Sequence, residues 1–582
     1  MESKDIRTPG TVQLIDLKQA SDGNHSSDVN AADIILIPTP TDDPEDPLNW
    51  SFRRKLLSTS CVFIYTVMVV LPSSTTVYSV TNPISKSTSL SIDNLITGLG
   101  IMFLFAGWAC IPWQAVALQY GKRPVYLVSS AGLVVVMALA PRCKTWGPYL
   151  ANKILHGILT APVESLCEIS ITDVWFAHER PRYLALYGFA LAFAGKFAPT
   201  LAGFINDGQG WEWTLYWSGI WVGFAFLYCL FLMEETTYDR PKNNSRSTVN
   251  TSDTNPTDAE AIDPEKKTAE VKATNQDCLA TKPSKSTPPH HVGALRFFSY
   301  PIVVYAGLMY GANGLVWSSI LNSTAGTLYP RVYGFSTSGI ALAYLGGVVG
   351  VIVGALYCGK LGEVLVIRLA RRNNGISEPE HILWTFMASL TMVPFSLILW
   401  GLGGTYGIHW LGMVFAQFTL SISNAIACPM ALAYAISAYP ELSGELVTTA
   451  VIIRNTMSFA INYAITPWIK AQGFRDTFIT AAAIGFVFNA SMFGMIRYGK
   501  KLREMSATRY WKTGTCFSVE SGMNDQFTLR SAREGLLARS DDTLVDMEAR
   551  DFEDEVEERG VDDMEERADN DVPLHRNISL LT

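Results

Sequence analysis

Long apolar runs separated by short polar segments fill most of the chain between residues 56 and 497. A helix needs about 20 apolar residues to cross a bilayer core about 30 Å thick, because each residue adds about 1.5 Å. Twelve runs of suitable length are bounded by charged residues, Pro or Gly. They predict an all-α membrane protein with spans near residues 56–77, 95–116, 125–140, 149–174, 183–205, 214–233, 301–321, 338–357, 382–402, 408–437, 446–469 and 478–497.

The fourth and fifth runs are less apolar than the rest, and losing either would change the topology. Lys and Arg residues beside the spans test the count, because they stay preferentially on the cytoplasmic side. With both termini inside, 18 such residues flank the cytoplasmic ends of the spans and 6 flank the external ends. This bias favours twelve spans with both termini in the cytoplasm.

A polar segment divides the spans into two sets of six. Residues 241–291 are rich in Ser, Thr, Asn, Pro and Lys, which is typical of a flexible linker. We therefore predict a cytoplasmic N-terminal tail (1–54), a six-helix bundle (55–234), a cytoplasmic linker (235–298), a second six-helix bundle (299–498) and a cytoplasmic C-terminal tail (499–582).

Composition agrees with a lipid environment, since 48% of the residues are hydrophobic and 17% are charged, against about 25% charged in soluble domains. The net charge of -8 comes from the end of the chain. Residues 511–582 hold 19 Asp and Glu against 8 Lys and Arg, a charge of -11, so the rest of the chain carries +3. So acidic a segment has little apolar surface to bury, which predicts a disordered or transiently helical tail.

Cysteine and histidine usage argues against several classes of site. The nine cysteines lie singly and the eight histidines are scattered, so neither a disulfide framework nor a metal site is indicated. No nucleophile, metal-pair or phosphate-loop constellation is visible, and we expect no enzyme activity and no cofactor. The first fifty residues contain no signal peptide pattern.

Two sets of six spans around a linker are typical of parallel-repeat transporters, which bind substrate near the bilayer midplane between the halves. A receptor and a membrane-embedded enzyme are the alternatives that topology leaves open.

Five stretches of sequence narrow this choice. They are DPLNWSFRRK (46–55), YGKRPVYL (120–127), EISITDVWFAHERPRYLALYG (168–188), GWEWTLYW (210–217) and RNTMSFAINYAITPWI (454–469). With these stretches in this order, the chain resembles fungal transporters of the major facilitator superfamily, in the twelve-span drug:proton antiporter group that includes the histidinol-resistance type. The resemblance implies the major facilitator fold and covers about residues 46–503.

The loop between the second and third spans matches the Gly-Arg-Lys element that the superfamily uses for gating. Gly121, Lys122 and Arg123 match this element, but Leu118 stands where the family has an acidic residue. The usual salt-bridge lock is therefore in doubt. The alternative role for Lys122 and Arg123 is to set the topology.

The fourth and fifth spans resemble two further elements of the antiporter group. Lys153 and His156 in NKILHG replace an Arg and a Gln, and the family's basic residue at this place is associated with proton movement. The alternative for Lys153 is a snorkelling cation at the outer helix end. In GKFAPTLAGF, Pro199 and Gly203 match an antiporter element, and simple helix packing is the alternative reading.

Four charged residues lie inside predicted spans: Glu164, Glu168, Lys196 and Arg454. Each costs roughly 2.5 to 3.5 kcal/mol to insert, so each is a functional candidate. Glu164 and Glu168 share a helix face because they are four residues apart. By its depth Lys196 can pair with Glu164, and we predict Glu164 as the proton-binding carboxylate with Lys196 as its alternating partner. A static ion pair is the alternative.

Substrate contacts are predicted from the spans that line the cavity in this superfamily. Aromatic and amide side chains there suit amphipathic or cationic organic molecules, with belt or packing roles as the alternative. The candidates are Tyr78, Trp108, Trp113, Asn313, Trp317, Asn424, Tyr434, Arg454, Asn462 and Tyr463.

Together these features predict proton-coupled export of a small organic compound, such as a drug or secondary metabolite, by alternating access. Uptake of an organic cation, polyamine or other nutrient is the alternative, and a transceptor or sensor is the alternative from another class. The predicted partners are the lipid bilayer, a small organic substrate and protons, with no nucleic acid, and the predicted state is a monomer. The predicted location is the plasma membrane, with a vacuolar or other internal membrane as the alternative.

Overall fold

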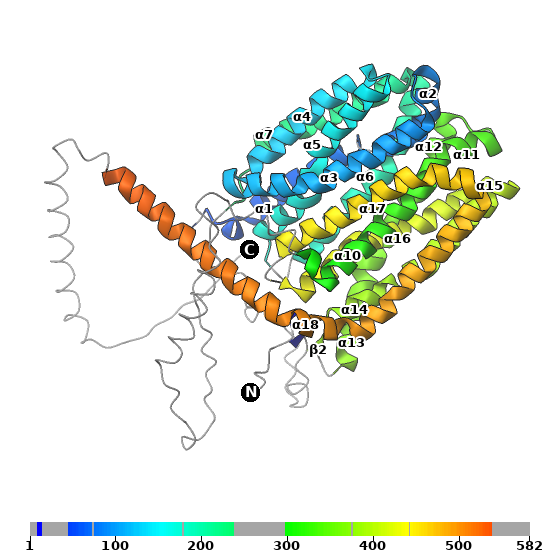
Figure 1. The fold of residues 1–582 in the computed structure, drawn as a ribbon. Helices are drawn as coiled ribbons and strands as arrows, with labels where there is room; N and C mark the ends of the chain where they lie inside the picture. The colour runs from blue at the N-terminus through cyan, green and yellow to red at the C-terminus, as the bar shows by residue number, and fades with distance from the viewer. Residues whose placement is uncertain are drawn as a thin grey trace, which may run out of the picture. The chain divides into compact units, whose positions relative to one another are not determined.

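The structure is a computed structural model that describes residues 9–13, 43, 45–72, 75–176, 180–237, 297–373, 376–440 and 443–537. It divides into two units, Met1–Tyr510 and Trp511–Thr582. The helix bundle lies in the first unit (Figure 1). The predicted linker at 241–291 and the acidic run at 551–567 lie outside the described residues.

The first half of the bundle follows a 3-10 turn at Pro47–Asn49. Its helices are α1 (Phe52–Val70), α2 (Thr75–Ser87), α3 (Ile92–Tyr120), α4 (Lys122–Leu139), α5 (Trp146–Val174), α6 (Arg180–Gln209) and α7 (Trp211–Leu232), with a 3-10 turn at Ala140–Arg142.

The second half begins with a 3-10 turn at Phe297–Ser299. Its helices are α10 (Pro301–Gly311), α11 (Trp317–Tyr333), α12 (Thr337–Leu356), α13 (Gly362–Arg372), α14 (Glu380–Leu383), α15 (Met387–Tyr406), α16 (Trp410–Ala438), α17 (Ser443–Gln472) and α18 (Phe474–Leu537). Five-residue π-helices at Ala312–Val316 and Tyr357–Leu361 join α10 to α11 and α12 to α13, and a 3-10 turn at Trp384–Phe386 joins α14 to α15.

These helices form twelve long segments in the predicted order, which confirms the predicted fold class. Among the described residues, nine segments are long and apolar enough to cross a membrane, and they include α5 and α6, the two spans that looked weakest in the sequence. The other three are α1, the α10–α11 segment and α17. We call the end of the bundle where α1 begins the inner end, predicted to be cytoplasmic, and the opposite end the outer end.

Two segments differ from the prediction in their continuity. The helix of the first span ends at Val70, before Leu71 and Pro72, because proline has no N–H to donate to a continuing helix. The loop expected after residue 357 is instead helical, since α12 continues through a π-helix into α13.

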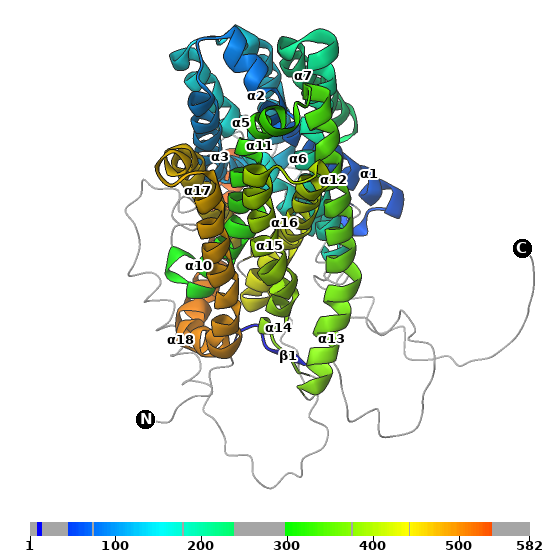
Figure 2. The same cartoon turned by 90° about the vertical axis from the view of Figure 1, so that its right-hand side faces the viewer.

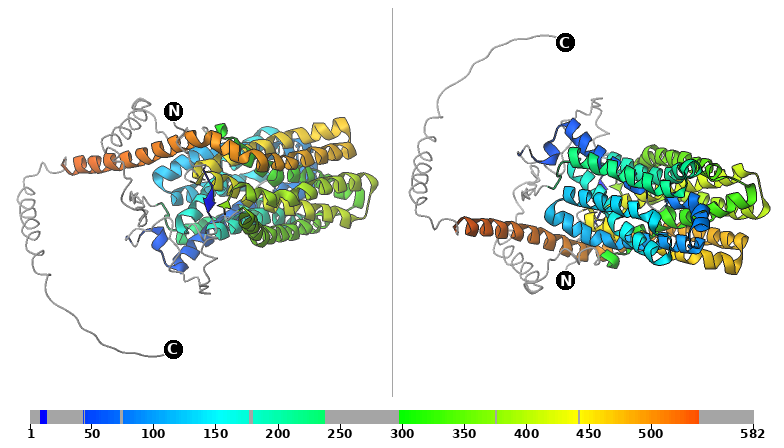
Figure 3. Two further views of the ribbon diagram at one scale, coloured as in Figure 1. Left: turned by 90° about the horizontal axis from the view of Figure 1, so that it is seen from below. Right: turned by 90° about the horizontal axis from the view of Figure 1, so that it is seen from above.

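Each half has its own apolar core. In the first half Tyr65, Tyr126 and Leu133 are fully buried, with the Tyr65 hydroxyl 2.7 Å from Ser129 Oγ. In the second half Trp400 and Tyr329 are fully buried, and Trp400 Nε1 donates to Thr324 Oγ1 over 3.0 Å. The two sets of helices run side by side (Figures 2 and 3).

The halves meet mainly along two helix pairs, α3 with α17 and α6 with α12. Glycine permits the close approach of the backbones in both pairs. A Cβ atom on Gly107 of α3 would lie 2.7 Å from Asn455 Cβ of α17. A Cβ on Gly203 of α6 would lie 2.5 Å from Ala341 Cβ of α12.

Part of the predicted N-terminal tail is ordered against the inner end of the second half. Val12 and Gln13 form strand β1 (Val12–Gln13), which pairs antiparallel with β2 (Ile376–Ser377) beside α13 and α14 (Figure 2). Arg503 of α18 is fully buried and donates to the Pro9 carbonyl over 2.6 Å. The same guanidinium donates to both oxygens of Glu380, over 2.9 and 2.7 Å.

The predicted tail at 499–582 therefore begins too early. Residues 499–510 continue α18, and Tyr510 is buried with its ring 5.4 Å from that of Tyr439. Apolar and charged contacts hold residues 499–510 in the bundle. The acidity of the later residues led the sequence analysis to assign this segment to the tail.

Candidate functional site

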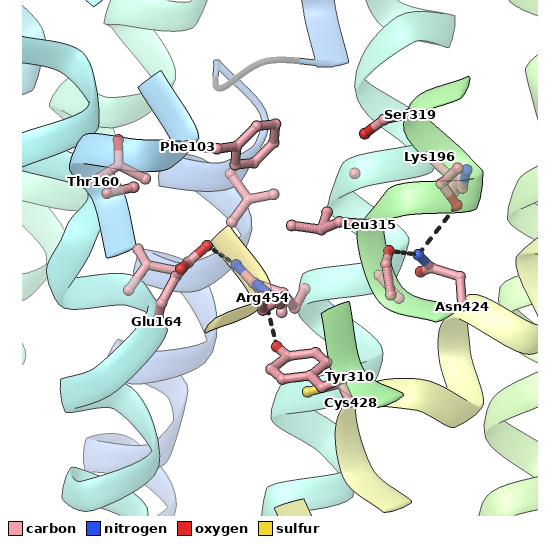
Figure 4. Close-up of a pocket in the computed structure, with 18 of the residues that line it drawn as sticks. Phe103, Thr160, Glu164, Lys196, Tyr310, Leu315, Ser319, Asn424, Cys428 and Arg454 are labelled. Carbon is pink, nitrogen blue, oxygen red and sulfur yellow. Dashed lines mark hydrogen bonds and ion pairs between the residues drawn. The ribbon is translucent and has the colours of Figure 1, made fainter. Parts of the chain in front are cut away.

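A cavity of about 110 Å³ lies between the two halves, at the middle of the long helices (Figure 4). Apolar side chains such as Phe103 and Leu191 form much of its wall. Its polar and charged lining consists of Tyr78, Thr160, Glu164, Lys196, Tyr310, Ser318, Ser319, Asn322, Asn424, Cys428 and Arg454.

Glu164 and Arg454 form a buried ion pair at this cavity. Glu164 belongs to α5 in the first half and Arg454 to α17 in the second, so the pair connects the two halves. One Glu164 oxygen accepts from Arg454 Nη2, and the other accepts from Asn455 Nδ2. Both carboxylate oxygens are thus bound by groups of α17.

Arg454 is also bound within its own half. Its Nη1 donates to the Tyr310 hydroxyl over 2.6 Å, and its guanidinium carbon lies 4.8 Å from the centre of the Tyr310 ring. Its Nη2 donates to Asn455 Oδ1 over 3.1 Å. Losing Glu164 would therefore leave the guanidinium tied to α10 and α17 only.

Glu168 lies one helical turn from Glu164 and is 6% exposed. It has no hydrogen bond or ion pair at bonding distance among the described residues, although the charges of Arg454 and Glu164 both act on it. Two buried carboxylates thus lie near one guanidinium, and within the described residues it is Glu164 that pairs with it. A buried charge without a partner is costly in free energy.

The predicted pairing of Glu164 with Lys196 is wrong for this structure, because Arg454 holds Glu164. Lys196 lies at the other side of the cavity, near Asn424 and Ser319 (Figure 4). Depth along the two helices suggested the pair, but depth does not specify which way a side chain points around the helix axis.

Lys153 and His156 are buried in the outer part of α5 and do not line the cavity. Lys153 Nζ lies 5.7 Å from the centre of the Tyr149 ring. Neither ring nitrogen of His156 has a hydrogen-bond partner among the described residues, and the same is true of Thr160 Oγ1. With Glu164, these side chains follow one face of α5 at spacings of three and four residues.

Three of the predicted substrate contacts, Tyr78, Asn424 and Arg454, line the cavity. Asn424 donates to the carbonyl of Gly314, inside the π-helix Ala312–Val316, and to Ser318 Oγ over 3.4 Å. A π-helix widens the turn and displaces backbone carbonyls from their usual partners, which often marks a functional position. Here the amide of Asn424 takes up one of these carbonyls.

The other predicted contacts lie elsewhere, which corrects the prediction. Asn313 donates to Asn489 Oδ1 over 2.9 Å, Trp317 packs in the core of the second half, and Asn462 donates to the Ser458 carbonyl over 2.8 Å. Trp108 and Tyr463 are 46% and 63% exposed on the bundle surface. The sequence identified spans that border the cavity, but it does not show which side of each helix faces the cavity. Trp113 and Tyr434 do not line the cavity either.

The sequence interpretation did not single out several residues of the site. Tyr310 and Asn455 complete the Glu164–Arg454 pair, and Ser318, Ser319 and Asn322 form the cavity wall on α11. The polar sequence SSILNS in an otherwise apolar span was the available signal for this wall.

The inner loop between α3 and α4 is held by acidic residues from outside the family element. Lys122 pairs with Asp173 at the inner end of α5. The backbone N–H groups of Lys122 and Arg123 donate to Glu235 over 2.9 and 3.0 Å, and Glu235 thereby caps α4. Gly121 has φ +93°, and a Cβ there would lie 2.6 Å from Glu235 Oε2.

The pKa of Glu235 reflects this contact. Burial raises it, but the N–H groups of Lys122, Thr237 and Arg123 stabilise the charged form and bring the net pKa below its usual value of 4.5. The loop is therefore held by ionic and hydrogen-bond contacts although position 118 is not acidic, and the residues that make these contacts belong to the first half.

No group of three or more His, Cys, Asp or Glu side chains suited to a metal ion occurs in the part of the chain that the structure describes. Fold and site together define a membrane transporter: two helical halves enclose a partly polar cavity and are joined across it by a buried ion pair.

Comparison with known proteins agrees with this class. The model of the Major Facilitator Superfamily matches residues 62–467, and the chain belongs to this family, whose members are transporters and not enzymes. It is 28% identical to the uncharacterized MFS-type transporter C1271.10c of Schizosaccharomyces pombe, over 86% of this chain and 94% of the relative. It is 24% identical to Protein HOL1 of Saccharomyces cerevisiae, over 85% and 95%, and 22% identical to MFS transporter fsa7 of a Fusarium species, over 79% and 88%.

Proposed function

We propose that this chain is a proton-coupled secondary transporter that moves a small organic compound by alternating access. The observation that supports this most directly is the Glu164–Arg454 ion pair, because it joins α5 of one half to α17 of the other beside the cavity. A group that can gain a proton at such a place links protonation to the contact between the halves.

The coupling step follows from the charges. A proton that binds Glu164 neutralises the carboxylate and removes the counter-ion of Arg454. Glu168 lies one turn away and pairs with no group among the described residues, so its carboxylate then becomes the available counter-ion for the guanidinium. When Glu164 loses its proton again, the bridge between α5 and α17 re-forms.

We further propose export as the direction of transport. Glu164 and Arg454 line the cavity, so a substrate that fills it restricts the access of a proton to this cluster, whatever the charge of the substrate. A site that accepts one or the other but not both exchanges them, and an inward proton gradient then drives the substrate outward. Uptake of an organic cation or polyamine is the second candidate, because the two carboxylates outnumber the one guanidinium.

The remaining predicted residues have roles in this scheme. We assign the face of α5 from Lys153 through His156 and Thr160 to Glu164 as the route by which protons reach the cluster. Pro199 and Gly203 of α6 belong to the outer contact between the halves, where Thr200 Oγ1 donates to the Ala341 carbonyl over 3.1 Å. Lys122 and Arg123 stabilise the inner end.

Coupling can be tested without knowing the substrate. Cysteines replacing the exposed residues Lys86 and Tyr406 report the distance between the outer ends of the halves by spin labelling in nanodiscs. We expect this distance distribution to change between pH 8 and pH 5 in the parent protein. Glu164→Gln should hold one distribution at both pH values. A Glu164→Gln variant that responds to pH as the parent does would contradict the proposal.

Direction requires vesicles with an imposed pH gradient. Spermidine serves as a cation probe for the uptake candidate. Movement of spermidine in the same direction as the protons, driven by the gradient, supports uptake. Movement of spermidine against the proton flow supports export. A protein that responds to pH but moves no compound would favour the sensor class.

A further inference from the structure

Lys196 is a buried ammonium group for which the described part of the chain supplies no counter-ion. It is 7% exposed, and among the described residues it has neither a hydrogen bond nor an ion pair. A charge at this depth costs roughly 2.5 to 3.5 kcal/mol and normally faces a partner or a water-filled cavity. Here the side chain lines the cavity, so its partner has to come from the contents of the cavity.

The surroundings of Lys196 come from the opposite half. Its aliphatic stem lies on Gly347 of α12, where a Cβ would be 3.5 Å from Lys196 Cδ. Ser421 Oγ, 3.1 Å from the same Cβ position, is buried and has no hydrogen-bond partner among the described residues. Lys196 thus extends from α6 across the interface between the halves.

The rest of this wall also offers unused hydrogen-bonding groups. Asn322 is 6% exposed and lines the cavity, and its Oδ1 has no partner in the part of the chain that is described. Ser319 and Asn424 lie on the same side as Lys196 and away from Glu164 (Figure 4). The ammonium and the serine hydroxyls of this wall are donors, and Asn322 Oδ1 is an acceptor.

The wall that carries Glu164 and Arg454 does not offer a second free cation to an anionic ligand. Glu164 is held by Arg454 and Asn455, which leaves Lys196 as the charged lining residue that has no partner among the described residues. The cavity therefore presents a satisfied ion pair on one side and an unsatisfied cation on the other.

We propose that Lys196 binds an anionic oxygen group of the transported compound, and that the substrates are compact organic acids, including zwitterions with a carboxylate. This rests on the proposed transport function. The Lys196 ammonium and the neighbouring serine hydroxyls match a carboxylate in charge and hydrogen bonding, and Asn322 Oδ1 is an acceptor for the ammonium of a zwitterion. The cavity of about 110 Å³ is smaller than pockets for drug-sized ligands, which favours a compact compound.

Three probes of one shape and different charge test this substrate class: benzoate, benzamide and benzylammonium. Equilibrium binding is measured on the purified full-length protein in nanodiscs at pH 7. We expect benzoate to bind at least tenfold more tightly than either of the other two. Lys196→Gln should lower benzoate affinity by at least tenfold, and Lys196→Arg, which keeps the charge, should retain most of it.

A matched control is Lys144→Gln, which removes an exposed lysine of the outer loop and should leave benzoate affinity unchanged. Preference of the wild type for benzylammonium, no binding of benzoate, or equal benzoate affinity in wild type and Lys196→Gln would each overturn the inference. Lys196→Gln must elute and melt like the wild type, which separates lost binding from lost folding, and retained binding in Lys196→Arg shows that the site itself still forms.

The outcome is separable from that of the coupling proposal. Lys196→Gln keeps the Glu164–Arg454 pair, so the distance between labels at positions 86 and 406 should still respond to pH. Loss of benzoate binding with that response intact supports a substrate role for Lys196. If the parent protein shows no pH response but Lys196→Gln loses benzoate, coupling fails and the substrate class stands.

Discussion

At the scale of single residues, buried charges in this chain find partners far away in the sequence. Glu164 and Arg454 are 290 residues apart, and Glu235 caps a helix that begins at Lys122. The sequence was sufficient to select Glu164 and Arg454, since a charge inside an apolar span is rare. It was insufficient to pair them, because span position gives depth in the bilayer and not orientation around the helix.

The cap on α4 gives a prediction of this kind. Glu235→Gln keeps the shape of the side chain but weakens its hydrogen bonds to two backbone N–H groups, and we expect the protein to lose about 1 kcal/mol of stability. Thermal melting in detergent at pH 7 measures the loss. Glu234→Gln, at the neighbouring position, changes a carboxylate that pairs with Arg54 and does not cap α4.

The same variant has a predictable pH dependence. The pKa of Glu235 is lower in the folded protein than its usual value of 4.5, so its contribution is complete above that value. The contribution is lost as pH falls through the lower folded pKa. The gap in melting temperature between wild type and Glu235→Gln should therefore be constant from pH 7 to pH 5 and should narrow below pH 4.5. A gap that widens on acidification would contradict the capping role.

At the scale of helices, hydropathy was a good guide to which segments span and a poor guide to how they are broken and packed. The α-helix is interrupted after α1 and at the π-helix Ala312–Val316, yet both places lie inside spans predicted from apolar runs, so hydropathy does not reveal either interruption. Contacts between helices depend on single small residues. Gly203 resembled an antiporter element in the sequence, and in the structure it is where α6 approaches the backbone of α12.

The α6–α12 contact gives a prediction about the outer end. Valine at position 203 would place its Cβ 2.5 Å from Ala341 Cβ and 2.7 Å from the Thr337 carbonyl, so the two helices must separate. We expect Gly203→Val to lengthen the distance between labels at positions 86 and 406 and to stop transport. Gly208→Val on the same helix meets no atom within 4 Å and serves as the control. Equal distances in both variants would show that this contact does not hold the outer end closed.

At the scale of the whole chain, the fold class could be predicted because lipid imposes one solution on long apolar runs, whereas the ends of the chain could not. Residues 9–13 form a short segment, PGTVQ, and no periodicity marks it as structured. Their order comes from Arg503, which lies 492 residues after Thr11 and donates to Thr11 Oγ1 over 3.1 Å. Such an interaction has no local signal in the sequence.

Arg503 gives the last prediction, because it joins three elements at the inner end of the second half. Arg503→Gln leaves Glu380, which is 3% exposed, without its bidentate partner, and removing one member of a buried pair costs about 3 to 5 kcal/mol. Deleting residues 1–13 removes strand β1 and the Pro9 and Thr11 contacts but keeps the ion pair, so it should cost less. Thermal melting of both variants should therefore rank the deletion between the wild type and Arg503→Gln. If the deletion melts at the wild-type temperature, the N-terminal segment adds nothing to the stability of this end. If it melts below Arg503→Gln, the strand stabilises the inner end more than the ion pair does.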